Sequence, residues 1–177
     1  SARSSPCLTA WIGMAKYSKD LDLKFVKRVK QISTEFPMLG EIKIEPIRLI
    51  KGNTYGEVMK ANELTQLFTG EENVVAIALY EELFDKLDEN VQNILIRNLL
   101  EQINAEESKD GMSIKVKIEK PQLNIGLETY HLYGDIATQA LEGVLLILDQ
   151  MAEQEREMKE LAKQEKARNK KSNKKGF

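Results

Sequence analysis

The feature that most constrains the fold is a short, uninterrupted apolar segment followed closely by an amphipathic helix. Residues 74–79 are all apolar and are bounded by turn signals, which favours a buried strand. Asp88 can cap a helix over 89–104, where apolar residues recur at helical spacing. We therefore expect this helix to pack against the sheet that contains the buried strand.

The composition is that of one folded domain. The chain has 177 residues, of which 42% are hydrophobic and 31% charged, so it can bury a real core and lies outside the disordered range. Cys7 is the single cysteine, which excludes an internal disulfide. No apolar run approaches the roughly 18–20 residues that span a bilayer, so we expect no membrane segment and a cytoplasmic location.

The pattern along the chain predicts an α+β fold, with a small mixed β-sheet packed on an N-terminal helix, the helix 89–104 and a long C-terminal helix. Asp20 or Asp22 can cap the N-terminal helix, which Pro37 ends. Pro46 indicates a bulge or a sheet edge, because proline lacks an amide donor. The other expected elements are a helix over 20–36, a strand over 41–50, an ambiguous segment 55–68, a loop over 106–111, a strand over 112–118, a partner strand around Leu123, Ile125 and Leu127, and a helix that begins near Asp135.

We divide the chain into three parts. Residues 1–13 are expected to be a leader or an artificial extension without regular structure. Residues 14–150 form a single α+β domain. Residues 151–177 form a solvated helical extension that frays into a basic, disordered tail, because core-forming residues thin out there and charged residues dominate.

The helix 89–104 carries a pattern typical of zinc peptidases, but without their ligands. In the motif H-E-x-x-H, two histidines lie four residues apart on one helical face and a glutamate acts as the general base. Together with the strand 74–79 and the segment 81–87, the residues 94–97 resemble the zincin-like metallopeptidase family encoded by phages and prophages. The segment 55–60 is similar to the one that precedes the strand in that family, and the resemblance covers about residues 20–150.

The resemblance implies that the catalytic residues are absent. Asn98 and Gln102 stand where the family has its two histidine ligands, and Leu99 stands where it has the glutamate base. A neutral amide is a poor zinc ligand, and leucine cannot take a proton from metal-bound water. We therefore expect a degenerate motif with no catalytic residue, no bound metal and no cofactor.

A second ligand set is the alternative. Glu101 lies beside the two amides, and Glu128, His131 and Asp135 lie downstream, where the family's third ligand is expected. These groups can hold a hard cation loosely. The simpler interpretation makes Glu101 a solvent-facing helix residue and Asp135 the N-cap of the last helix.

Two further groups are candidates for binding. Tyr130, His131 and Tyr133 form either a packed cluster or a small recognition patch. Asn98 and Gln102 need hydrogen-bond partners if they are buried. We expect them to bond each other or the adjacent sheet edge and close the former cleft, and the alternative is that they line a pocket for an extended peptide.

The sequence thus favours a catalytically inactive, metallopeptidase-like protein that binds a host or phage protein, on the cleft or on the last helix, in the bacterial cytoplasm. One alternative is an active metal-dependent hydrolase with the second ligand set. The other is a nucleic-acid-associated accessory protein, because the tail carries cations without acids and can neutralise phosphates. A solubilising terminus is the simpler interpretation of these cations, which are Lys166, Arg168, Lys170, Lys171, Lys174 and Lys175.

Overall fold

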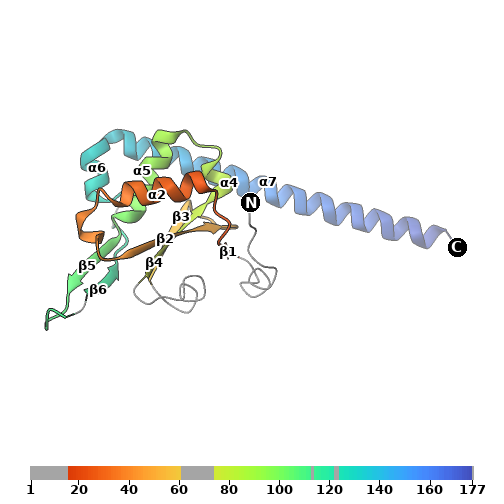
Figure 1. The fold of residues 1–177 in the computed structure, drawn as a ribbon. Coiled ribbons are helices and arrows are strands. Elements are labelled where there is room, and N and C mark those ends of the chain that lie inside the picture. Colours follow the sequence, from red (N-terminus) through yellow and green to blue (C-terminus); the bar gives the residue numbers. More distant parts are fainter. Residues whose placement is uncertain (1–15, 61–73, 113, 122–123, 177) are drawn as a thin grey trace.

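The computed structural model describes residues 16–60, 74–112, 114–121 and 124–176, and its fold is α+β, as predicted. Within this part of the chain, a four-stranded sheet has the order β1-β2-β4-β3 (Figure 1). β2 and β4 run parallel, and β1 and β3 run antiparallel to their neighbours. The strands are β1 (Tyr17–Ser18), β2 (Lys43–Leu49), β3 (Gly56–Lys60) and β4 (Val74–Tyr80).

The predicted buried strand is β4. All seven of its residues are buried, and β2 and β3 flank it on either side. Pro46 lies in β2 and pairs in continuous register with Ile77 of β4, so no bulge forms. On the other side of β2, β1 pairs only with Arg48 and Leu49. Among the described residues Pro46 therefore has a strand neighbour on one side only, which is the edge-like position that its missing amide donor requires.

Helices α2 (Leu23–Ser33) and α5 (Glu89–Leu100) lie on the same side of the sheet (Figure 1). Both begin with the caps that the sequence predicts, since Asp22 accepts from the Lys24 amide and Asp88 accepts from the Val91 amide. A short helix α4 (Glu81–Phe84) follows β4 directly. The predicted helix 20–36 was too long, because α2 ends at Ser33 and Pro37 instead opens the 3-10 helix η1 (Pro37–Leu39).

The predicted end of the helix 89–104 was wrong. α5 stops at Leu100, and the chain enters β5 (Ile103–Glu107), which pairs antiparallel with β6 (Ile114–Ile118). The Gln102 amide bonds to the Leu99 carbonyl, and the Gln102 carbonyl accepts from the Glu119 amide. The helix thus ends because residue 102 already belongs to the base of the hairpin, and the expected loop 106–111 is partly strand. Gln102 therefore lies outside α5 and does not share a helical face with Asn98, as the motif H-E-x-x-H would require.

The predicted partner strand around 123–127 was also wrong. Residue 123 lies outside the described part of the chain, Ile125 is in no strand, and Leu127 begins helix α6 (Leu127–Tyr133). The partner of β6 is β5. Gly134 then turns the chain at a φ of 60°, a conformation that favours glycine. It, and not Asp135, is the N-cap residue of the last helix.

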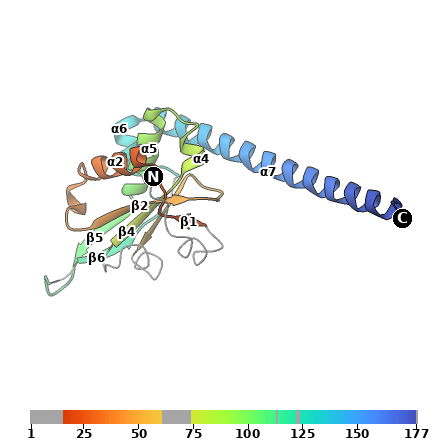
Figure 2. The same cartoon turned by 45° about the vertical axis from the view of Figure 1, so that its right-hand side comes forward.

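Helix α7 (Asp135–Lys175) is continuous over 41 residues and projects far beyond the sheet (Figure 2). Its first part packs against α5 and α6 through the buried residues Ala137, Leu141, Val144 and Leu148. From residue 153 to 176 every residue is exposed. The helical extension was predicted, but the expected disordered tail is helix as far as Lys175.

Some expectations fall on other parts of the chain. Residues 1–13 and 61–68, including the expected leader, lie outside the described residues. Within the described ranges, none of the helices combines the length and the apolar character that crossing a membrane requires.

Candidate functional site

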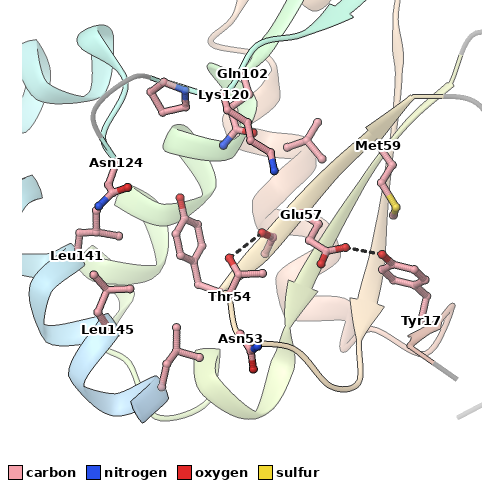
Figure 3. A pocket seen from close by; sticks show the side chains of 15 residues that line it. Tyr17, Asn53, Thr54, Glu57, Met59, Gln102, Lys120, Asn124, Leu141 and Leu145 are labelled. Carbon is pink, nitrogen blue, oxygen red and sulfur yellow. Dashed lines mark hydrogen bonds between the residues drawn. The ribbon is translucent and has the colours of Figure 1, made fainter. Parts of the chain in front are cut away.

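A cleft of about 570 Å³ runs along the outer edge of β3 (Figure 3). Successive residues of this strand line it, although alternate side chains of a strand point to opposite faces of the sheet. The cleft therefore wraps around the strand edge. Its lining residues are Tyr17, Asn53, Thr54, Tyr55, Gly56, Glu57, Val58, Met59, Gln102, Lys120, Pro121, Asn124, Leu141, Leu145 and Leu148.

The edge of β3 that faces away from β4 carries main-chain hydrogen-bonding groups. The Tyr55 carbonyl accepts from the Tyr80 amide, so in this antiparallel ladder the residues two and four positions later also bond to β4. The main-chain groups of Gly56 and Val58 then point the other way. The Gly56 carbonyl accepts from the Thr54 hydroxyl at 3.2 Å, which agrees with that direction. The Val58 groups point away from β4, and β6 also contacts β3.

Asn98 is buried in the last turn of α5, and all parts of its amide are bonded. Its Nδ2 donates to the Tyr55 hydroxyl at 2.7 Å and to the Asn124 carbonyl at 3.0 Å. Its Oδ1 accepts from the Gly126 amide at 2.7 Å. One side chain thus ties α5 to the entry of β3 and to the segment before α6. We expected Asn98 and Gln102 to bond each other or the adjacent sheet edge, and the partner of Asn98 near the sheet is the Tyr55 hydroxyl, one residue before β3.

Leu99, which the resemblance aligns with a general base, is packed into the core. Only 1% of it is exposed. A Cβ added to Gly56 would lie 2.7 Å from the Leu99 Cδ1 and 2.8 Å from the Ala78 carbonyl oxygen. β3 and α5 approach each other this closely only because position 56 has no side chain. An aliphatic group therefore fills the space between the helix and the edge strand.

No family model, curated protein or solved structure matches this chain. What the site can do is therefore argued from its own residues.

Glu101 does not face solvent as a free helix residue. Its Oε1 accepts from the Glu128 amide at 2.7 Å, and its Oε2 accepts from the Thr129 amide at 3.0 Å and from the Thr129 hydroxyl at 2.7 Å. A carboxylate at this position satisfies the unpaired amides of the first turn of α6 and complements the helix dipole. The simpler interpretation of Glu101 was wrong in detail, since it is an anchor for α6.

The second ligand set is not assembled. Glu101 is committed to the α6 amides, whereas Glu128, His131 and Asp135 are exposed. Across residues 16–60, 74–112, 114–121 and 124–176, no three His, Cys, Asp or Glu side chains come together in a way that could hold a metal ion.

Gln102 lines the cleft from the turn that follows α5, and Lys120 lines it from the chain after β6 (Figure 3). At another part of the cleft Glu57 is held by two partners. Its carboxylate accepts from the Tyr17 hydroxyl and pairs with the Lys16 ammonium at 2.8 Å. Burial, and next the bond to Glu57, raise the pKa of Tyr17, so its hydroxyl stays a donor.

The tyrosine and histidine candidates lie elsewhere. Tyr130 lines an apolar groove of about 690 Å³ beside α6 and α7, which shares lining residues with the cleft, namely Pro121, Asn124, Leu141 and Leu145. His131 is exposed and Tyr133 is half-buried, and neither lines the cleft or the groove. Sequence reasoning had missed Tyr55, Lys120 and Asn124, for which no local pattern gives a signal.

Proposed function

We propose that this chain is a catalytically inactive, metallopeptidase-like protein that binds an extended segment of a host or phage protein in the cleft beside β3, in the bacterial cytoplasm. The observation that carries the proposal is the outer edge of β3, whose main-chain groups open into a cleft large enough for a peptide.

The inactive character rests on what occupies the three motif positions. Asn98 has both donors and its carbonyl oxygen engaged by protein groups, and a neutral amide is in any case a poor zinc ligand. Leu99 is buried against Gly56 and has no basic atom. Gln102 is a neutral amide at the rim of the cleft.

The choice of an extended peptide rests on the geometry of the strand edge. A strand edge binds a peptide through main-chain hydrogen bonds, and flanking pockets then select its side chains. Here Leu141, Leu145 and Leu148 of α7 form an apolar wall on one side of the cleft, while Gln102 and Lys120 supply polar groups. Such a site selects peptides first by an extended main chain and second by their side chains.

The decisive experiment uses a pool of synthetic random decapeptides passed over the immobilised protein, with retained peptides identified by mass spectrometry. Val58→Pro removes an amide that points away from β4, so the existing ladder is kept while a donor to the peptide is lost. Retention should fall at least tenfold. Val58→Thr, which keeps the amide, serves as the matched control. Equal retention by Val58→Pro and the unmodified protein would refute binding at this edge.

The relationship to metallopeptidases has its own test. Asn98→His together with Gln102→His should bind zinc through two imidazoles if these positions correspond to the family's ligands. Neither single variant should retain zinc through dialysis. A double variant that folds, as judged by circular dichroism, and still binds no zinc would show that the correspondence of positions is wrong.

A second candidate function is favoured by the exposed end of α7. This end carries six cations and no acid from residue 166 on, and it projects away from the rest of the protein (Figure 2). Six neutralised phosphates would give a steep loss of affinity with salt, with a slope of about −5 in log K against log salt for duplex DNA. Truncation after Glu165 should abolish retention on duplex DNA, and unchanged retention would eliminate this candidate.

A further inference from the structure

The charged side chains that line the cleft differ in whether they have partners among the described residues. The Glu57 carboxylate is balanced by the Lys16 ammonium and bonded by Tyr17, so that part of the cleft offers no unpaired charge. Lys120 forms no ion pair with the residues described. Its neighbour Glu119 is turned to the hairpin, where its Oε2 accepts from the Asn104 side-chain Nδ2 at 2.7 Å.

Lys120 is held beside Gln102 by the backbone. The Glu119 amide donates to the Gln102 carbonyl at 2.8 Å, which fixes the chain after β6 against the turn that follows α5. Figure 3 shows the side chains of both residues pointing into the cleft from the same end. An ammonium and a primary amide thus converge there, and both are hydrogen-bond donors.

We infer that Lys120 and Gln102 form a carboxylate-binding subsite at this end of the cleft. This inference rests on the proposed function. It specifies a peptide with a carboxylate beyond the residues that pair with β3. The carboxylate comes from the last residue of the partner chain or from an Asp or Glu side chain. Lys120 is exposed, and a Lys–carboxylate contact at an exposed site changes affinity by about 1.5- to fivefold.

The experiment compares three forms of the same random decapeptide pool on the immobilised full chain. One pool has free C-termini, the second has C-terminal amides, and the third has C-terminal amides and lacks Asp and Glu. Retention of the third pool should be about 1.5- to fivefold lower than that of the best of the other two. Loss on amidation alone identifies the C-terminus, and loss only in the third pool identifies an acidic side chain.

Variants of Lys120 test whether this residue causes the preference for peptides with a carboxylate. Lys120→Met should remove the difference between the pools, whereas Lys120→Arg, which keeps the charge, should preserve it. Lys115→Met is the matched control, because Lys115 is exposed on β6 and does not line the cleft.

The outcomes separate this inference from the proposed function. If all three pools are retained equally, or if Lys120→Met leaves the preference intact, the subsite is refuted while binding along β3 stands. If no pool is retained above the level of Val58→Pro, both fail.

Discussion

The amide of Asn98 and the hydroxyl of Tyr55 lie 2.7 Å apart, and this hydrogen bond joins the last turn of α5 to the first residue before β3. Both residues are buried. The position that the family resemblance assigns to a metal ligand is therefore used to fasten the edge strand to the helix beneath it. The following predictions test this and the neighbouring contacts.

Asn98→Ala should destabilise the protein by about 2–3 kcal/mol, because the Tyr55 hydroxyl and the Gly126 amide would be left buried without their partner. Urea unfolding followed by circular dichroism measures the loss. Asn90→Ala is the control, since Asn90 lies exposed on the same helix and should change stability by less than about 0.5 kcal/mol. A loss for Asn98→Ala no larger than that of the control would mean that these hydrogen bonds contribute nothing.

Gly56→Ala should cost about 1–3 kcal/mol, because the new methyl group would collide with Leu99 and with a main-chain oxygen that cannot move aside. Thermal and urea unfolding both report this. Gly143→Ala is the matched comparison, since a Cβ there meets nothing within 4 Å and the position is helical. It should be neutral or stabilising by up to about 1 kcal/mol. If both variants behave alike, the close approach of β3 to α5 is not as described.

Glu101→Ala should weaken α6 by about 1–2 kcal/mol, since its first-turn amides lose a carboxylate acceptor. Hydrogen exchange should accelerate at the Thr129 amide and remain unchanged at amides in the middle of α5. Glu142→Ala, at an exposed position of α7, is the control. Protection at Thr129 that survives in Glu101→Ala would contradict the anchoring role.

The free energy of unfolding should fall at alkaline pH, partly because of Tyr55. Burial raises the pKa of Tyr55 above its ordinary value of 10.0, and the bond from Asn98 opposes this shift. Well below pH 10 the folded and unfolded chains both keep the phenolic proton, so the contribution of Tyr55 to the free energy of unfolding is fully present. As the pH rises further, the unfolded chain loses the proton first, and unfolding becomes easier.

Tyr55→Phe should therefore show a shallower loss of stability above pH 10 than the unmodified protein, whatever its stability at neutral pH. Urea titrations at a series of pH values measure the slope. Tyr130→Phe, at an exposed position, should leave the slope unchanged. An identical slope in Tyr55→Phe would mean that this phenol does not ionise differently in the two states.

Local patterns predicted the elements whose signals lie within a few residues. The uninterrupted apolar run at 74–79 and the capping residue Asp88 were sufficient to predict β4 and the start of α5. β5 was not predicted, because Ile103 also continues the helical spacing of Leu95 and Leu99, and the segment Ile-Asn-Ala-Glu-Glu is short and rich in residues with low strand preference. It forms through pairing with β6, including an ion pair between Glu106 and Lys117. Cross-strand pairing overrides weak local preference in this way.

The candidate site was only partly predictable for the same reason. The need of Asn98 for partners followed from the sequence, but its partners are Tyr55, Asn124 and Gly126, which lie 43, 26 and 28 residues away. Nothing in the local sequence identifies such distant partners. Lys120 is one of 26 Lys and Arg residues, and only the folded hairpin brings it to the cleft.

The exposed half of α7 also sets a distance. Residues 154–175 rise by about 1.5 Å each, so the basic tip stands roughly 30 Å away from the place where the helix leaves the fold. The helix thereby holds the basic tip at a distance from the rest of the fold. A macromolecule bound at the tip and a peptide bound along β3 would therefore be too far apart to collide.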